Sequence, residues 1–104
     1  MKKYMTIRLR DGSLWGYPTE TIARHRANFY KDEFGGSLER SLAEDTIPLF
    51  EESEYEISDW AAGNMDVTDF LNGMVQLKAP ETIPLTYLDH NNALSNGKKS
   101  FCDG

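Results

Sequence analysis

Apolar and polar residues alternate along YMTIRLRDGSLWGYP, residues 4–18. The two alternating runs flank Asp11-Gly12, a pair preferred in two-residue type I′ turns, and together they predict a β-hairpin. A two-residue loop places Arg8 opposite Trp15 on one face, where the guanidinium can stack on the indole. The other face, which we expect to meet the core, carries Met5, Ile7, Leu9 and Leu14.

Helical periodicity replaces this alternation over residues 19–34. Thr19 is the expected N-cap, and Gly35-Gly36 is the expected stop signal. The apolar side of the predicted helix comprises Ile22, Ala23, Ala27, Phe29, Tyr30 and Phe34. His25 lies toward the polar side, where we expect a surface residue. Arg26 projects toward the apolar side and is predicted to pair with acidic residues later in the chain.

Two shorter helices are predicted next. Ser37 is the expected cap of the first, and Ile47-Pro48 is expected to end it, because the residue before a proline is pushed out of the helical region. Ser53 and Glu56 have capping-box spacing at the start of the second helix. The residues that this second helix turns inward are predicted to be Ile57, Trp60 and Ala61.

The C-terminal third is less regular. Asp66 is the expected cap of a single turn whose inward residues are Val67, Phe70 and Leu71. MVQLK, residues 74–78, alternates and is predicted to form a third strand. Thr-Ile-Pro-Leu occurs at residues 46–49 and again at 82–85, where we expect two similar connectors. Residues 89–104 are polar, rich in turn residues and without periodicity, which predicts a flexible tail.

These patterns predict an α+β fold, in which an N-terminal β-hairpin and a third strand near 74–78 pack against three to four short helices. The chain has 104 residues, 39% of them hydrophobic, and a mean hydropathy of -0.57, which is typical of one soluble domain. We expect this compact domain to span residues 1–88. No apolar run is long enough for a bilayer, and MKKYMTIRLR lacks the apolar region of a signal peptide. The lone Cys102 fits a reducing compartment, so we expect a cytoplasmic protein.

Residues with catalytic or metal-binding chemistry are isolated in the sequence. Neither His25 nor His90 has a second base or a nucleophile at helical or strand spacing. Cys102 lies in the predicted tail, which cannot hold a catalytic geometry. The stretch NMDVTDFLNG, residues 64–73, lacks the ligand spacing of an EF-hand loop. We therefore expect a non-enzymatic protein with no cofactor and no metal site.

Charge is distributed unevenly along the chain, whose formal net charge is -6. Residues 1–31 hold seven Lys/Arg against two Asp/Glu, whereas residues 39–69 hold ten Asp/Glu against Arg40 alone. Carboxylates at this density repel one another, so they indicate either a solubilising surface or a basic partner. The predicted partner-binding residues are Glu51, Glu52, Glu54, Glu56 and Asp59.

The basic N-terminal third supports an alternative, contact with nucleic acid through the hairpin and the first helix. Its candidate residues are Arg8, Arg10, Trp15, Arg24 and Lys31. A β-ribbon with arginines and aromatic residues can dock on phosphates or stack on bases. The pI of about 4.8 for the whole chain argues against this alternative, so we expect a basic host protein as the partner rather than nucleic acid.

Four stretches within residues 7–66 resemble a group of small proteins found in phages and integrated mobile elements. They are RLRDGSLW, IARHRA, SLAEDTIPLF and YEISDWA. The resemblance implies an accessory protein of a mobile element, a setting in which small acidic inhibitors of host defence are common. The leading prediction is an anti-CRISPR-like inhibitor that occupies a basic, nucleic-acid-binding surface of a host complex. A structural or dimerising phage component is a further alternative, and the sequence leaves the oligomeric state open.

Overall fold

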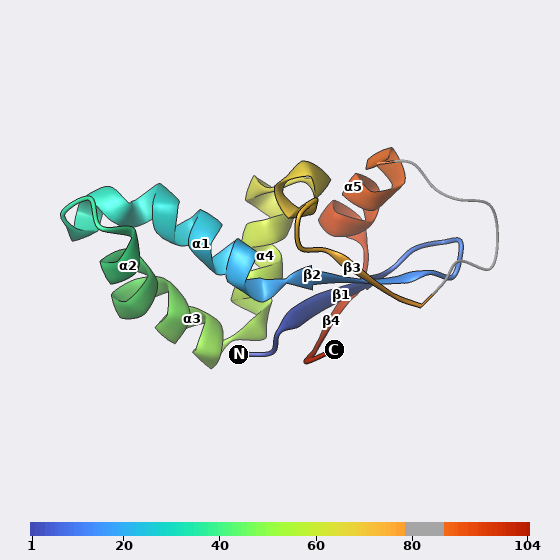
Figure 1. Cartoon of the computed structure of the whole chain (residues 1–104), viewed down its shortest axis with the longest axis horizontal. Coiled ribbons are helices and arrows are strands. Elements are labelled where there is room, and N and C mark those ends of the chain that lie inside the picture. Colours follow the sequence, from blue (N-terminus) through green and yellow to red (C-terminus); the bar gives the residue numbers. More distant parts are fainter. Residues whose placement is uncertain (79–86) are drawn as a thin grey trace.

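The structure is a computed structural model that describes residues 1–78 and 87–104, with side chains described for 1–78 and 91–104. As predicted, the fold is α+β, with helices packed against an antiparallel sheet (Figure 1). In the described part of the chain the sheet has four strands in the order β3-β2-β1-β4. Their bounds are β1 Tyr4–Arg8, β2 Leu14–Pro18, β3 Val75–Lys78 and β4 Lys99–Cys102. The predicted third strand is therefore confirmed.

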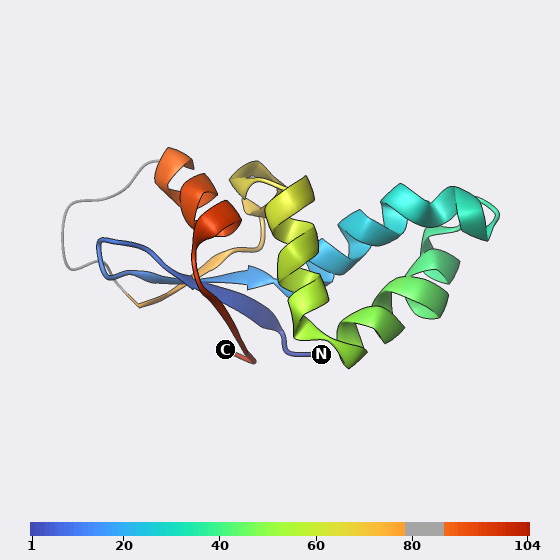
Figure 2. The ribbon, with the colours of Figure 1, turned by 180° about the vertical axis from the view of Figure 1, so that it is seen from behind.

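The described helices form two groups. Their bounds are α1 Thr19–Tyr30, the 3-10 helix η1 Lys31–Phe34, α2 Leu38–Ser41, the π-helix η2 Leu42–Thr46, α3 Ile47–Glu52, α4 Glu54–Asn64, the 3-10 helix η3 Val67–Phe70 and α5 Tyr87–Asn96. The first group, from α1 to α3, is an arm that extends from the sheet along the long axis of the molecule, whose principal extents are 48 × 22 × 21 Å (Figures 1 and 2). The second group, α4, η3 and α5, covers one face of the sheet.

The β1–β2 hairpin has a three-residue loop, so the predicted two-residue type I′ turn is wrong. A type I′ turn needs positive φ at both central residues, whereas only Gly12 has it in this loop, with a φ of 87°. Hydrogen bonds from Leu9 N to Ser13 O (2.9 Å) and from Gly12 N to Leu9 O (3.0 Å) close the loop. The buried carboxylate of Asp11 accepts hydrogen bonds from the backbone and the hydroxyl of Ser13, which stabilises the longer turn.

The longer loop shifts the pairing by one residue and moves the side chains of β2 to the opposite faces. Trp15 pairs with Ile7, and Leu14 pairs with Arg8. The predicted core face of β1 is confirmed by the burial of Met5, Ile7 and Leu9. Trp15 joins this face in place of Leu14. The predicted stacking of Arg8 on Trp15 is therefore wrong, because the two side chains lie on opposite faces of the sheet.

Pro48 does not end the helix that follows Ser37, contrary to the prediction. A proline ring in a regular α-helix clashes with the carbonyl four residues earlier. The turn before Pro48 is π-helical, with the N–H of Ile47 bonded to the carbonyl of Leu42 five residues back. This wider turn accommodates the ring, and the chain stays helical over residues 38–52. The first Thr-Ile-Pro-Leu is thus helix rather than connector, and the second lies outside the described residues.

The predicted helix caps are confirmed only in part. Ser37 accepts a hydrogen bond from the backbone of the following turn, and Asp66 caps η3, both as predicted. Ser53 occupies the N-cap position of α4 but makes no side-chain cap hydrogen bond, so the predicted capping box is wrong. Thr19 is the first residue of α1 rather than its cap, and its hydroxyl donates to backbone carbonyls of the N-terminal segment.

The core lies where the sheet, α1 and the second helical group meet. The largest fully buried hydrophobic side chains are Tyr17, Phe50, Phe70, Met5, Ile7, Ile22, Ile57, Leu94 and Val67. Burial raises the pKa of the Tyr17 phenol. Two residues predicted to point inward lie on the surface instead, since Phe29 is 66% exposed and Leu71 is 47% exposed.

The prediction of a flexible tail over residues 89–104 is wrong. In α5, Leu94 is 1% exposed and belongs to the core. β4 pairs antiparallel with β1, with Cys102 opposite Tyr4. A four-residue strand is too short for its alternation to stand out from the surrounding polar sequence. The folded unit therefore extends beyond residue 88 and includes β4.

We expect Leu94→Ala to lower the free energy of unfolding by about 3 kcal/mol, because it removes a fully buried leucine side chain from the core. Urea unfolding of the whole chain measures the change. Leu71→Ala, which trims a leucine that is 47% exposed, is the matched control and should have a much smaller effect. Equal, small effects of both substitutions would contradict the packing of α5.

Candidate functional site

Five carboxylates lie where α3 meets α4. Ser53 has extended backbone, with φ of -147° and ψ of 113°, so α3 ends and α4 begins on either side of this one residue. The five are the predicted partner-binding residues, called the acidic corner from here on: Glu51, Glu52, Glu54, Glu56 and Asp59. All are exposed except Glu56, which is half-buried.

Little in the described part of the chain neutralises the acidic corner. Glu51 accepts a hydrogen bond from the N-terminal amine of Met1 at 3.1 Å. The members that form no ion pair with described residues are Glu52, Glu54, Glu56 and Asp59. The helix dipole favours acids in the first turn of α4, which accounts for Glu54 and Glu56. It does not account for the remaining acids of the corner.

Tyr55 stands within the acidic corner, and reasoning from the sequence missed it. It is 68% exposed, and its hydroxyl donates a long hydrogen bond of 3.5 Å to Asp59, one helical turn further on. Large aromatic residues among polar neighbours are frequent anchors of protein interfaces. In the sequence, Tyr55 stands between two glutamates on the solvent side of an amphipathic helix. This position is the sequence feature that could have indicated an exposed ring.

Aromatic rings continue this surface from α4 onto α1. Trp60 is half-buried and follows Glu56 by one helical turn. Its ring centroid lies 5.5 Å from that of Phe29 and 5.8 Å from that of Tyr30. Phe29 is exposed at the outer side of this cluster. The acidic corner is thus bordered by apolar ring surface, which a protein partner can cover.

Arg26 joins α1, η2 and α4, and its predicted pairing with the acidic part of the chain is confirmed. Its Nη1 donates to Asp45 Oδ2 at 2.8 Å and to Thr46 Oγ1 at 2.9 Å. The guanidinium also lies over two rings, 4.8 Å from the centroid of Tyr30 and 5.9 Å from that of Trp60. The side chain of Arg26 is only 15% exposed, so these contacts fix the arm against α4.

His25 is not a surface residue, contrary to the prediction. It is half-buried, and its Nδ1 accepts a hydrogen bond of 3.0 Å from Nε1 of Trp60. The two rings lie with centroids 5.9 Å apart. A nitrogen that already accepts this bond helps to position Trp60 beside the acidic corner.

The residues of the nucleic-acid alternative do not form one surface. Arg24 and Lys31 belong to the arm, whereas Arg8 and Arg10 lie at the hairpin end of the molecule (Figures 1 and 2). Trp15 lies on the helix-covered face of the sheet. The structure therefore separates the predicted set into groups at the two ends of the long axis.

Carboxylates already engage the arginine at the middle of α1. Arg24 donates to Glu20 at 3.2 Å and to Glu39 at 3.4 Å, and these hydrogen bonds raise its pKa. Arg40, in α2, is held in the same way by Glu44 at 2.8 Å. Positive charge on the arm is therefore largely offset within the chain.

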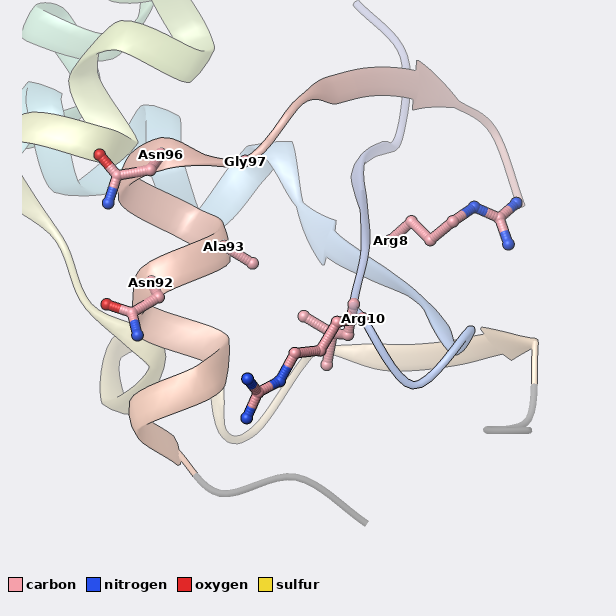
Figure 3. Close-up of a pocket in the computed structure, with 7 residues that line it drawn as sticks. Arg8, Arg10, Asn92, Ala93, Asn96 and Gly97 are labelled. Carbon is pink, nitrogen blue, oxygen red and sulfur yellow. The ribbon is translucent and has the colours of Figure 1, made fainter. Parts of the chain in front are cut away.

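Arg8 and Arg10 also point apart, as the close-up in Figure 3 shows. Arg10 extends toward α5, beside a shallow pocket of about 320 Å³, and Arg8 points away from it. Ala93 faces the hairpin, while the amides of Asn92 and Asn96 point away. The described residues that line this pocket do not provide the convergent polar groups that catalytic sites and small-molecule sites have.

Comparisons with protein families, curated proteins and solved structures gave no match. Among the described residues, no three His, Cys, Asp or Glu side chains form a group that could hold a metal ion. None of the described helices is both long and apolar enough to cross a membrane. The resemblance to phage and mobile-element proteins stays a prediction, and the acidic corner is the candidate functional site.

We expect Arg26→Ala to lower the free energy of unfolding by about 2 kcal/mol, because it leaves Asp45 and the buried hydroxyl of Thr46 without their charged donor. Arg24→Ala, on the same helix, is the control and should have a much smaller effect, since its ion pairs are exposed. Thermal and urea unfolding followed by tryptophan fluorescence compares the two variants. A larger loss for Arg24→Ala would contradict the role of Arg26.

Proposed function

We propose that this protein is a non-enzymatic binder of a basic host protein surface and that the acidic corner is its contact surface. The observation that supports this proposal is a set of carboxylates with a single ion pair among described residues, arranged around the exposed ring of Tyr55. Such a surface combines complementary charge, which steers association, with an aromatic anchor, which supplies buried area.

The composition of the surface also favours a protein partner over mere solubility. A solubilising surface needs charge but no exposed large apolar groups. Here Tyr55 is 68% exposed among the carboxylates of α4, and Phe29, whose ring contacts Trp60, is 66% exposed on α1. Aromatic residues of this kind are enriched in protein interfaces.

The specific form of the proposal is an anti-CRISPR-like inhibitor that acts in the cytoplasm of a bacterial host. Carboxylates spaced along α3 and α4 can occupy a groove that normally receives nucleic-acid phosphates. The resemblance of residues 7–66 to proteins of phages and mobile elements supports this setting. Purified CRISPR effector complexes test this form of the proposal. If the protein is such an inhibitor, adding it to the complex should reduce the binding of target DNA by the complex.

The double variant Glu52→Gln and Glu54→Gln should weaken binding to the host partner at least about tenfold, because two of the steering charges are lost. Retention of host proteins on the immobilised chain, quantified after washes at about 50 mM and about 500 mM salt, measures the effect. The partner should be basic and should be released by the high-salt wash.

The matched control for this experiment is Asp32→Asn with Glu33→Gln, which removes the same charge from exposed positions on η1. This control should retain the partner as well as the natural chain does. Equal loss in both double variants, or retention that is unchanged by salt, would overturn the assignment of the acidic corner.

Tyr55→Ala should weaken the same interaction at least about tenfold if the ring is an interface anchor. The melting temperature should hardly change, because Tyr55 is 68% exposed and lies outside the core. Comparing affinity with thermal unfolding separates the two effects. Unchanged affinity would remove Tyr55 from the proposed surface.

A further inference from the structure

The face of the sheet opposite α4, η3 and α5 carries a row of cations at its hairpin end. Arg8 in β1 pairs with Leu14 in β2, and Leu14 pairs with Lys78 in β3. On the other side, the pairing of β1 with β4 ends at Ile7 opposite Lys99, so Lys98 is the next neighbour of Arg8. Residues directly opposed in antiparallel strands share a face. The cations Lys78, Arg8 and Lys98, called the basic row from here on, therefore line up across the sheet.

The basic row is accessible to a ligand. All three of its side chains are exposed. A shallow groove of about 370 Å³ lies beside it, and its lining includes Thr6, Arg8, Leu14, Lys98 and Ser100. Lys99 points to the helix-covered face, where burial lowers its pKa, and it is not part of the row.

The charges of Arg8 and Lys98 repel each other. Neighbouring strands are about 4.8 Å apart, and like charges directly opposite each other on adjacent strands are destabilising. Neither Arg8 nor Lys98 forms an ion pair with another described residue. A bound polyanion would offset this repulsion, which makes an anionic partner the complement of this face.

The same face offers an aromatic ring. Gly16 leaves room for Tyr4, whose ring carbons lie 3.1 Å from where a Cβ of residue 16 would stand. The Lys3 ammonium lies 5.4 Å from the centroid of the Tyr4 ring. Tyr4 precedes Arg8 by four residues on β1, which is about 13 Å along the strand. Between the ring and the row lie the small residues Thr6, Gly16 and Ser100.

We infer that this open face binds single-stranded nucleic acid, with the basic row on the phosphates and Tyr4 stacked on a base. Cations that follow the backbone and an aromatic ring for an unpaired base are the two elements by which sheets hold single strands. A duplex has no free base for Tyr4. The low pI of the whole chain does not exclude nucleic-acid binding at this face, because charges beyond about 10 Å are screened at moderate salt.

Fluorescence anisotropy with a labelled oligothymidylate of about 15 nucleotides tests this inference on the whole chain. Three phosphate contacts predict that the logarithm of affinity falls with the logarithm of salt concentration with a slope of about -2. The double variant Arg8→Gln and Lys98→Gln should bind at least about tenfold more weakly and reduce that slope to about -0.7. Tyr4→Leu should weaken binding roughly tenfold through loss of stacking.

The matched control is Arg24→Gln with Lys31→Gln, which removes two cations from the arm and should leave the affinity unchanged. Melting temperatures of all variants show that each is folded. The inference is overturned if the oligonucleotide does not bind at low salt, or if the row and arm variants lose affinity equally. Tighter binding to a duplex of the same length, or to phosphatidylserine vesicles, also overturns it. The acidic corner is tested by different variants and a different measurement. A negative result with the oligonucleotide therefore does not affect the proposed contact with a basic protein.

Discussion

The pairing of β1 with β4 is the interaction on which the rest of the structure depends. β1 is a central strand, and it places residues from the two ends of the chain side by side, with Tyr4 opposite Cys102. One of its faces buries Met5 and Ile7 against the helices. Its other face carries Arg8 between Leu14 of β2 and Lys98, the residue that precedes β4. Without β4, β1 would become an edge strand, and Lys98 would no longer be held beside Arg8.

The arm and the sheet divide the charge of the molecule between them. Arginines on α1 are neutralised within the arm, by Glu20 and Glu39 at Arg24 and by Asp45 at Arg26. This internal pairing consumes cations of the N-terminal third, so the acidic corner and the basic row remain as surfaces of opposite sign. The two proposals assign these surfaces to different partners, the acidic corner to a basic protein and the basic row to single-stranded nucleic acid. The protein contact of the acidic corner and the nucleic-acid contact of the basic row can hold together, but neither requires the other.

Local patterns in the sequence are sufficient to predict several elements of the fold, and each wrong prediction has a physical cause. The hairpin, the first helix, the glycine stop and the third strand follow from alternation, periodicity and turn chemistry. The register was wrong because Asp11 uses its carboxylate to stabilise a three-residue loop, and a shift of one residue exchanges the faces of Leu14 and Trp15. Pro48 was misjudged because a π-helical turn admits its ring. β4 is not predicted because it pairs with a strand more than ninety residues away, which no local pattern reveals.

The acidic corner can be predicted from the charge of the sequence alone. Tyr55 and the basic row cannot, because side-chain exposure and strand register become known only from the fold.

The fold sorts charge into two separate surfaces, the acidic corner and the basic row. Amide chemical shifts of labelled protein, followed by NMR while unlabelled oligothymidylate is added at low salt, test this separation. We expect shifts that cluster on the open face, at Thr6, Arg8, Leu14, Lys98 and Ser100, with residues 51–59 unchanged. Shifts centred on α1, or an absence of any cluster on β1 and β4, would contradict it.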